Sequence, residues 1–313
     1  KDIGLKKVNM TGGEIFCRSD SIELIKDTIN MGLNVSIETN GTMITESQIK
    51  ELSQYKDNLS MSISLDGITS ETNNLTRGNG SFEKTFNTIK TIKKYNIPLR
   101  IITVLSDNNY DEIPKLAKTI HEELGLGFRL LPNIIEYGKG VTANDEYGVS
   151  YPKIKKLMDD FYYDFLRKHA EDENLTIELN MAIIPIDIYR HSFCPWGKAM
   201  LGIGYSGNVA LCHVASDNDM FIFDNVKNNK ISDIWKYNKK LLKFVNENPD
   251  DLKGVCGNCL ARSLCRGGCR LHAMSKYLGD FYAPDPDCQK VYDIGMFPEY
   301  ALDDVEKVCN YEK

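Results

Sequence analysis

The segment that decides the fold of the C-terminal part of this chain is residues 256–269, CGNCLARSLCRGGC, with four cysteines spaced C-x2-C-x5-C-x3-C. Three more cysteines frame it: Cys194 and Cys212 precede it, with Gly207 between them, and Cys288 follows it. Thiolates are soft ligands that hold iron–sulfur clusters or zinc. Seven cysteines in this order therefore predict two metal centres in one small domain.

Composition narrows the class of protein further. Nine cysteines, an odd number, and no apolar run typical of a signal peptide behind Lys1 argue against a disulfide framework and favour a reducing cytoplasm. No stretch has the apolar length of a membrane span. A net charge of −6 without a long Lys/Arg run argues against nucleic-acid binding. We expect a cytoplasmic protein with neither nucleic acid nor membrane as its partner.

Upstream of these cysteines, strand-like and helix-like runs alternate. The strand candidates are Lys7–Thr11, Asn34–Glu38, Leu59–Leu65, Leu99–Leu105 and Phe128–Leu131. The helix candidates that follow them are Ser21–Met31, Glu46–Tyr55, Phe82–Tyr95, Tyr110–Leu124 and Tyr151–His169. This alternation predicts an α/β fold of parallel strands with helices outside, either a barrel or an open sheet.

The candidate strand Leu59–Leu65 alternates serines with apolar residues. Period two places the serines Ser60, Ser62 and Ser64 on one face. Two interpretations stay open: that face lines a barrel interior with room for a ligand, or the strand lies at a sheet edge with one wet face.

The pattern changes from about Pro185 onward. Residues Met200–His213 predict a hairpin that turns at residues 206–208. Residues Ile231–Asn246 predict one amphipathic helix. The Gly- and Cys-rich loops that follow have little apolar content, so bound metal is expected to hold their backbone.

The residues resemble those of a known family. The seven-cysteine pattern is similar to the SPASM domain of radical S-adenosylmethionine (SAM) enzymes, and Thr11–Glu14 (TGGE) resembles the GGE motif of the same superfamily. Four further segments match in order: Glu38–Thr42, Ser64–Gly67, Arg77–Phe82 and Gly138–Gly140. The resemblance implies a partial parallel (β/α) barrel of radical SAM type in residues 1–185 and a SPASM domain in residues 186–313.

The resemblance has one departure. The family holds its SAM-cleaving cluster on a C-x3-C-x2-C loop after the first barrel strand, and this sequence has no such triad. The chain begins at Lys1, just before the second strand of the family's barrel. We therefore expect an N-terminally truncated chain that lacks the first strand, the triad loop and its helix, and that does not cleave SAM by itself.

The resemblance divides the seven cysteines between two auxiliary [4Fe–4S] clusters, besides a third cluster in the intact protein. The outer cluster would be held by Cys256, Cys259, Cys265 and Cys288, and the inner one by Cys194, Cys212 and Cys269. Zinc stays an alternative because C-x2-C also suits tetrahedral zinc, although seven ligands do not make two complete four-cysteine sites.

The resemblance does not identify the fourth ligand of the inner cluster. Some family members supply a cysteine a few residues before the first one, but Asp187–Phe193 contains none. The position is either free or filled by His191, His213, Cys17 or Cys309.

The resemblance also implies residues that bind SAM near the carboxyl ends of the first strands. Gly12 and Gly13 would let the backbone approach SAM, and Glu14 would bind its ammonium group. Thr39 and Asn40 lie near a strand end, and the strand ends carry the site in parallel barrels.

The next strand ends supply four more candidates. Ser64 and Asp66 would meet the ribose hydroxyls and Arg77 the SAM carboxylate, with Thr103 nearby. Alternatively, Ser64 and Asp66 cap the following turn and Arg77 projects into solvent.

For function, the resemblance implies a peptide-modifying oxidoreductase that uses a 5′-deoxyadenosyl radical. The favoured hypothesis is a maturase that forms a thioether from cysteine sulfur to carbon in a Cys-containing, ribosomally made precursor peptide, as in sactipeptides. The alternatives are an anaerobic sulfatase maturase, which makes formylglycine, and a non-catalytic two-cluster scaffold. A reductant such as flavodoxin or ferredoxin is the second expected partner.

Overall fold

The computed structural model describes residues 3–132, 136–161, 165–169, 171–177 and 194–303. The chain divides into two compact units, the first Lys1–Ile134 with Asp145–Glu178 and the second Ile135–Asn144 with Leu179–Lys313. The short segment Ile135–Asn144 thus groups with the cysteine-rich unit, although it precedes the end of the first unit in sequence. The helices in the described part of the chain lack the length and apolar character needed to cross a bilayer.

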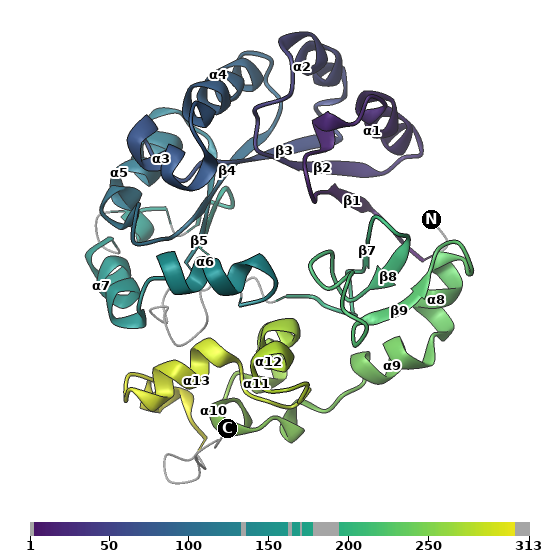
Figure 1. Ribbon diagram of the computed structural model, residues 1–313, viewed down its shortest axis with the longest axis vertical. Coiled ribbons are helices and arrows are strands. Elements are labelled where there is room, and N and C mark those ends of the chain that lie inside the picture. Colours follow the sequence, from purple (N-terminus) through teal and green to yellow (C-terminus); the bar gives the residue numbers. More distant parts are fainter. Residues whose placement is uncertain (1–2, 133–135, 162–164, 170, 178–193, 304–313) are drawn as a thin grey trace. The chain divides into compact units, whose positions relative to one another are not determined.

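The first unit is built on a six-stranded sheet whose strands follow one another in sequence order (Figure 1). The strands are β1 (Lys7–Met10), β2 (Asn34–Thr39), β3 (Leu59–Ser64), β4 (Leu99–Val104), β5 (Gly127–Leu131) and β6 (Leu175–Ile177). Every neighbouring pair is parallel. The predicted parallel βα arrangement is therefore confirmed, and the carboxyl ends of these strands meet at one edge of the sheet.

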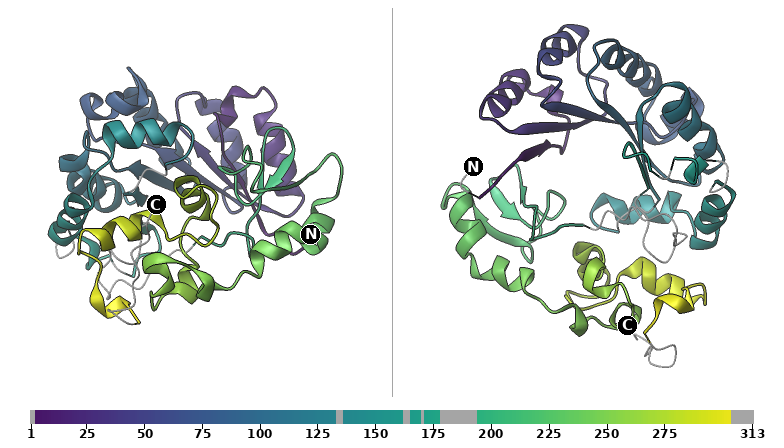
Figure 2. Two further views of the ribbon diagram at one scale, coloured as in Figure 1. Left: turned by 60° about the horizontal axis from the view of Figure 1, so that its bottom comes forward. Right: turned by 180° about the vertical axis from the view of Figure 1, so that it is seen from behind.

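Helices connect the strands and lie on the outer side of the curved sheet, as Figures 1 and 2 show from three directions. They are α1 (Ser21–Asn30), α2 (Glu46–Leu52), α3 (Ser70–Arg77), α4 (Ser81–Lys94), α5 (Ile113–Lys118) and α7 (Tyr151–Phe161). Helix α3 has no counterpart among the predicted helices; the Thr69 side chain caps it by accepting from Thr72 N. The predicted helix Tyr110–Leu124 is instead a 3-10 turn, α5 and a π-helical turn.

Strand β3 settles one of the two open interpretations. It pairs with β2 on one side and β4 on the other, so the edge-strand alternative is wrong. Leu59, Met61 and Ile63 are buried, whereas the three serines are half-buried. The alternation therefore separates an apolar face, which packs into the core, from a more accessible hydroxyl face.

The second unit has little regular structure beyond short elements. Its antiparallel sheet consists of β7 (Gly202–Ile203), β8 (Asn208–Ala210) and β9 (Ile222–Asn225), and β7 and β8 form the predicted hairpin. Its helices are α6 (Lys139–Tyr147, which continues into the first unit), α8 (Ile231–Tyr237), α9 (Lys239–Val245), α10 (Gly254–Gly257), α11 (Arg262–Cys265), α12 (Arg270–Lys276) and α13 (Pro286–Asp293).

The prediction of a single helix over Ile231–Asn246 is wrong. The chain leaves helical conformation at Asn238, whose side chain accepts a hydrogen bond from Leu241 N and so caps a second helix, α9. A side-chain cap offers the backbone an alternative to continuous helix, which an apolar period alone does not reveal.

One carboxylate, Glu136, attaches the start of the second unit to its C-terminal helices. Glu136 accepts from Lys276 Nζ on α12 at 2.8 Å and from Lys290 Nζ on α13 at 2.6 Å. Burial alone would raise the pKa of this carboxyl, but the two ammonium groups prevail and lower it from 4.5 to about 2. Glu136 thus stabilises the folded unit in its charged form.

We predict that Glu136→Gln lowers the free energy of unfolding of the second unit by about 1–2 kcal/mol at pH 7, because Lys276 and Lys290 lose their charged partner. The effect is no larger because water screens the partly exposed lysines. A depressed folded-state pKa gives stability that is present above about pH 4.5 and is lost as the pH falls toward 2. Urea titrations of wild type and variant should therefore differ at pH 7 and converge near pH 2. A difference that does not change with pH would contradict the assignment.

Candidate functional site

The loop after β1 carries the first candidate residues. Gly12 and Gly13 have φ values of 90° and 36°, in the left-handed region that favours glycine. A Cβ added at either position would meet no atom within 4 Å, so the backbone faces open space there. A ligand can therefore approach these peptide groups closely.

Glu14 joins this loop to the end of β2. Its carboxylate accepts from Thr39 Oγ1 at 2.7 Å and from Asn40 N at 2.9 Å. It also accepts from Phe16 N at 3.2 Å. A carboxylate has about four acceptor positions, so one remains for a cationic donor from outside the protein. The structure thus brings Glu14, Thr39 and Asn40 together, as three of the residues expected to bind SAM.

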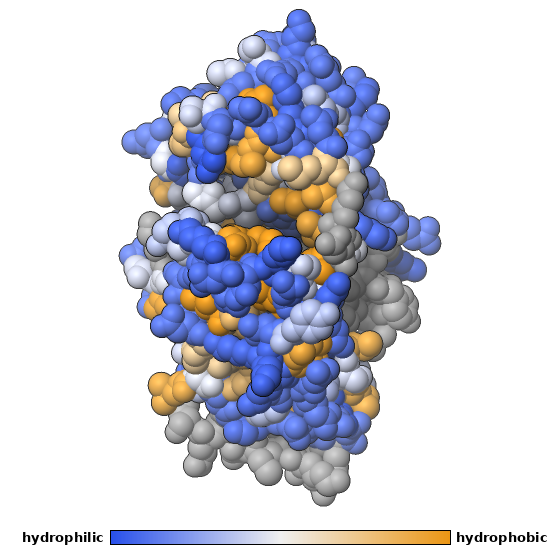
Figure 3. All heavy atoms as spheres, turned by 90° about the vertical axis from the view of Figure 1, so that its right-hand side faces the viewer, coloured by the Kyte–Doolittle hydropathy of each residue, from blue (hydrophilic) through white to orange (hydrophobic). Residues whose placement is uncertain are grey.

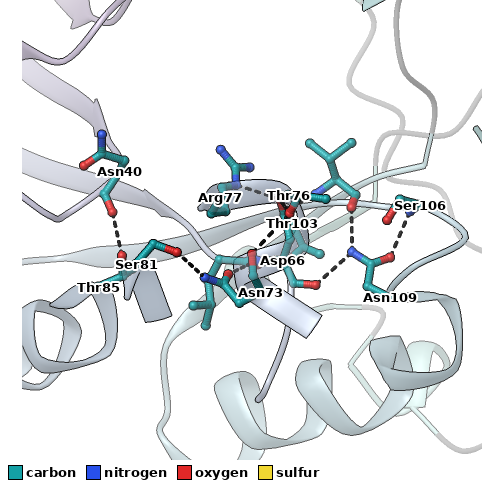
Figure 4. A network of polar contacts seen from close by, with 12 residues as sticks. Asn40, Asp66, Asn73, Thr76, Arg77, Ser81, Thr85, Thr103, Ser106 and Asn109 are labelled. Carbon is teal, nitrogen blue, oxygen red and sulfur yellow. Dashed lines mark hydrogen bonds and ion pairs between the residues drawn. The ribbon is translucent and has the colours of Figure 1, made fainter. Parts of the chain in front are cut away.

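The side chain of Asn40 is used in a local turn. Its Oδ1 accepts from Thr42 N and Thr42 Oγ1, and its carbonyl accepts from Thr85 Oγ1 on α4 at 2.8 Å (Figure 4). Asn40 therefore contributes its backbone N–H to Glu14 while its side chain shapes the turn.

Asp66 lies at the centre of a second network, drawn in Figure 4. Its carboxylate accepts from Arg77 Nε at 2.6 Å, from Thr76 Oγ1 at 3.1 Å and from Val104 N at 3.0 Å. Its carbonyl accepts from Asn109 Nδ2 at 2.8 Å. Asp66 is only 4% exposed, so the carboxylate joins the end of β3 to α3 and to β4.

The remaining strand-end candidates differ in how exposed their side chains are and in whether those side chains already have partners within the protein. Ser64 ends β3 and is half-buried. Thr103 is fully buried and donates its hydroxyl to Leu65 O at 2.7 Å. Arg77 is ion-paired with Asp66 and its side chain is 29% exposed, so the alternative that it simply projects into solvent is wrong.

Sequence analysis missed the amides that complete this network. Asn73 Oδ1 accepts from Asp66 N, and its Nδ2 donates to Ser81 Oγ. Asn109 Oδ1 accepts from Ser106 N. Both asparagines are 1% exposed. The one available signal was the frequency of Asn in the segments after β3 and β4, which by itself indicates only turns.

The cysteines of the second unit lie in loops and short helices. Burial raises the pKa of six of the thiols, to about 11 for Cys265 and about 12 for Cys269. An apolar environment disfavours the thiolate, so these groups hold their protons at neutral pH unless a cation replaces them. Such buried thiols are suited to metal ligation and not to nucleophilic catalysis.

Charged neighbours act on several of these thiols. After burial, Asp285 raises the pKa of Cys256, Cys265 and Cys288, and neighbouring thiols raise it further. Burial raises the pKa of Cys269, and Cys194 and Cys212 are the thiols that add to this effect. We call the four cysteines expected at the outer cluster, Cys256, Cys259, Cys265 and Cys288, the outer set. We call the three expected at the inner cluster, Cys194, Cys212 and Cys269, the inner set.

Backbone N–H groups point at the sulfurs of both sets. The N–H of Asp285 donates to Cys256 Sγ at 3.2 Å. Burial dominates the pKa of Cys212, Cys259, Cys265 and Cys269, and backbone hydrogen bonds oppose it at all four. Hydrogen bonds to sulfur are one means by which proteins tune iron–sulfur clusters, so the donor set fits such a group.

Within residues 3–132, 136–161, 165–169, 171–177 and 194–303, no three His, Cys, Asp or Glu side chains converge on one metal position. The sulfurs around one zinc ion lie within about 4 Å of one another, whereas each thiolate of a [4Fe–4S] cluster binds a different iron.

Among the candidates for a fourth inner ligand, His213 is exposed and Cys17 lies in the first unit, on the 3-10 turn Ile15–Cys17. His191, Cys309 and the segment 187–193 lie outside the described residues.

We predict that Asp66→Asn lowers the free energy of unfolding of the first unit by about 1–3 kcal/mol, because Arg77 loses its charged partner in a half-buried place. Ser64→Ala, at the end of the same strand, is the control and should change it by less than about 0.5 kcal/mol. Urea denaturation of both variants measures the difference. Equal effects would contradict a structural role for the Asp66 carboxylate.

Two segments of the chain match models of known protein families. The family model of the radical SAM superfamily matches residues 1–120, and that of SPASM, an iron–sulfur cluster-binding domain, matches residues 194–260. The AdoMet-dependent heme synthase of Methanosarcina barkeri is 26% identical over 309 residues, which cover 91% of this chain and 83% of that protein. The PqqA peptide cyclase of Rhizobium meliloti is 26% identical over 302 residues, 92% and 75% of the two chains.

Solved structures share the fold. The protein anSMEcpe with bound AdoMet has a TM-score of 0.66 at 20% identity and covers 93% of this chain and 82% of that chain. Streptococcus suis SuiB bound to its precursor peptide SuiA has a TM-score of 0.68 at 19% identity, with coverages of 90% and 65%. The sheet is thus a partial barrel of radical SAM type. Residues 1–120 thus form a radical SAM domain, and residues 194–260 form a SPASM iron–sulfur cluster-binding domain.

Proposed function

We propose that this chain is the body of a radical SAM–SPASM enzyme that modifies a ribosomally made peptide by joining a cysteine sulfur to carbon. Family membership supports radical chemistry, and the peptide-modifying relatives PqqA peptide cyclase and precursor-bound SuiB support a peptide substrate. The thioether product rests on one observation of this chain, the composition of the inner set.

The inner set contains three thiols within the described residues. A [4Fe–4S] cluster takes four ligands, so a cluster held by Cys194, Cys212 and Cys269 has one place for a ligand from elsewhere. Cys194 is exposed, whereas Cys212 and Cys269 are half-buried. The set therefore has a side that a peptide thiol can reach from solvent.

The other residues of the proposed site act on SAM and on the strand ends. Glu14 would accept from the SAM ammonium group, and the open backbone of Gly12 and Gly13 would lie against the cofactor. The Asp66–Arg77 pair would hold the ends of β3 and β4 in place. When bound, SAM and the clusters would supply the 5′-deoxyadenosyl radical and the electron transfer; the chain supplies position and a buried environment.

A second candidate, tetrapyrrole modification, is favoured by one observation. The heme synthase of M. barkeri is as similar to this chain as the peptide cyclase is, at 26% identity, and is covered over 83% of its length. Formylglycine formation and a non-catalytic scaffold remain alternatives without a specific observation in their favour.

We predict about eight irons per chain after anaerobic reconstitution, in two [4Fe–4S] clusters of the second unit. Cys265→Ala and Cys269→Ala form a matched pair, because only three residues lie between them, yet they belong to different sets. Each should remove a different electron paramagnetic resonance signal. About four irons in wild type, stoichiometric zinc, or loss of the same signal in both variants would contradict the assignment.

We predict that the full-length enzyme, given SAM, a reductant and a cysteine-rich peptide encoded nearby, yields a product two hydrogens lighter. Thioether formation removes the thiol hydrogen and one carbon-bound hydrogen, so each bond also removes one alkylatable thiol. Mass spectrometry with thiol alkylation measures both changes.

The control is the same peptide with serine in place of cysteine. It should give no product and, unlike the cysteine peptide, should leave the spectrum of the inner cluster unchanged. Formylglycine from a sulfatase peptide, or conversion of a porphyrin substrate without any reaction of the peptide, would overturn the proposal.

A further inference from the structure

Helices α8 and α9 carry a concentration of positive charge that the proposed chemistry does not use. Residues 227–243 contain six lysines and one acidic residue, Asp233, in a chain of net charge −6. Five of the lysines are exposed and have no ion-pair partner among the described residues: Lys227, Lys230, Lys236, Lys239 and Lys243. We call these five the lysine surface.

The sixth lysine is different and fixes the helix beneath the others. Lys240 Nζ donates to Asp219 O at 2.7 Å and to Ile222 O at 2.9 Å. These bonds tie α9 to the segment that leads into β9, so the lysine surface stands on a fixed element.

Apolar side chains are exposed among the lysines. Tyr237 is 71% exposed and Leu242 is 38% exposed. Figure 3 views the molecule from the side on which α8 and α9 lie in Figure 1, and hydrophilic side chains predominate there with apolar ones between them. An aromatic and an aliphatic group within a charged rim is the composition of a protein-docking surface.

The opposite face of α9 packs into a core that two cysteines of the inner set also contact. Leu241 is buried in that core with Trp196, and Cys212 and Cys269 pack against it. Helix α9, which is about 10 Å across with its side chains, thus presents lysines on one face and contacts this core through Leu241 on the other.

A buried arginine connects the end of α9 with the inner set. Arg266 donates to Val245 O, the last residue of α9, at 3.0 Å, and its guanidinium lies 3.9 Å from the ring centre of Trp196. Trp196 follows Cys194 by two residues. Arg266 and Trp196 thus link the end of α9 to the chain segment that contains Cys194.

We propose that the lysine surface of α8 and α9 docks an acidic protein that carries a one-electron redox group and exchanges an electron with the inner set's cluster. The proposal rests on the proposed function for the presence of that cluster. In each encounter the reduced carrier loses one electron and the site gains it, with no bond or proton transferred; the reverse exchange balances in the same way.

The size and chemistry of the surface favour this partner over others. Two seven-residue helices offer a small contact area, as in transient electron-transfer encounters, which bury less than about 1,200 Å². Unpaired charge of one sign speeds such encounters by electrostatic steering. A nucleic acid is disfavoured as the partner, because the chain as a whole has a net charge of −6 and would repel it.

The test uses reconstituted full-length enzyme and reduced bacterial flavodoxin, an acidic carrier, in stopped-flow oxidation of the flavodoxin. Wild type should react faster at low salt than at high salt. Lys236→Glu/Lys239→Glu/Lys243→Glu should be at least about tenfold slower at low salt and should lose the salt dependence.

The control variant, Lys50→Glu/Lys84→Glu/Lys115→Glu, makes the same change in net charge at exposed lysines of α2, α4 and α5 and should match wild type within about twofold. The milder Lys236→Gln/Lys239→Gln/Lys243→Gln should be intermediate, and it replaces the reversal variant if that one does not fold. A wild-type rate without salt dependence, or an equal loss in the control, would overturn the proposal.

Two further measurements separate this proposal from the proposed function. Dithionite should reduce the clusters of all variants equally, and iron content should not change, because the lysines are not ligands. Peptide modification driven by titanium(III) citrate needs no carrier and should be unaffected by the charge reversal. If that assay fails in wild type while flavodoxin exchange depends on the lysines, the proposed function is wrong and the docking surface stands.

Discussion

The burial of the cysteine thiols is the constraint on which the second unit depends. Helices α10 and α11 are four residues long, far below the length at which a helix is stable by itself. These helices contain Cys256 and Cys265, and burial raises the pKa of both thiols. A metal bound to these cysteines would take the place of the thiol protons, so cluster assembly would be coupled to the folding of these short segments.

In the first unit, side chains hold the carboxyl ends of the strands in place beside the open backbone of Gly12 and Gly13. The parallel ladder aligns β1 to β4, but hydrogen bonds between strands stop where the strands end. Glu14 and Asp66 continue the cross-connections beyond that point, one between β1 and β2 and the other from β3 to α3 and β4. These contacts hold the strand ends in place, so a ligand that binds there would have fewer groups to order.

Sequence patterns predicted what depends on short-range order. The alternation of strands and helices gave the parallel sheet, and the period of Leu59–Leu65 separated its two faces. The break at Asn238 was missed because one side-chain cap outweighed an uninterrupted apolar period. The Asp66–Arg77 pair depends on tertiary approach, which a short-range pattern does not reveal. The partition of the thiols stays a prediction from family resemblance.

Glu136 has a mechanical consequence. Its two lysine partners lie on α12, which starts directly after Cys269 of the inner set, and on α13, which contains Cys288 of the outer set. One carboxylate thus joins a helix from each thiol set to the chain segment that enters the second unit. Tension applied to that segment is divided between both helices, so the two sets respond to it together and not one at a time.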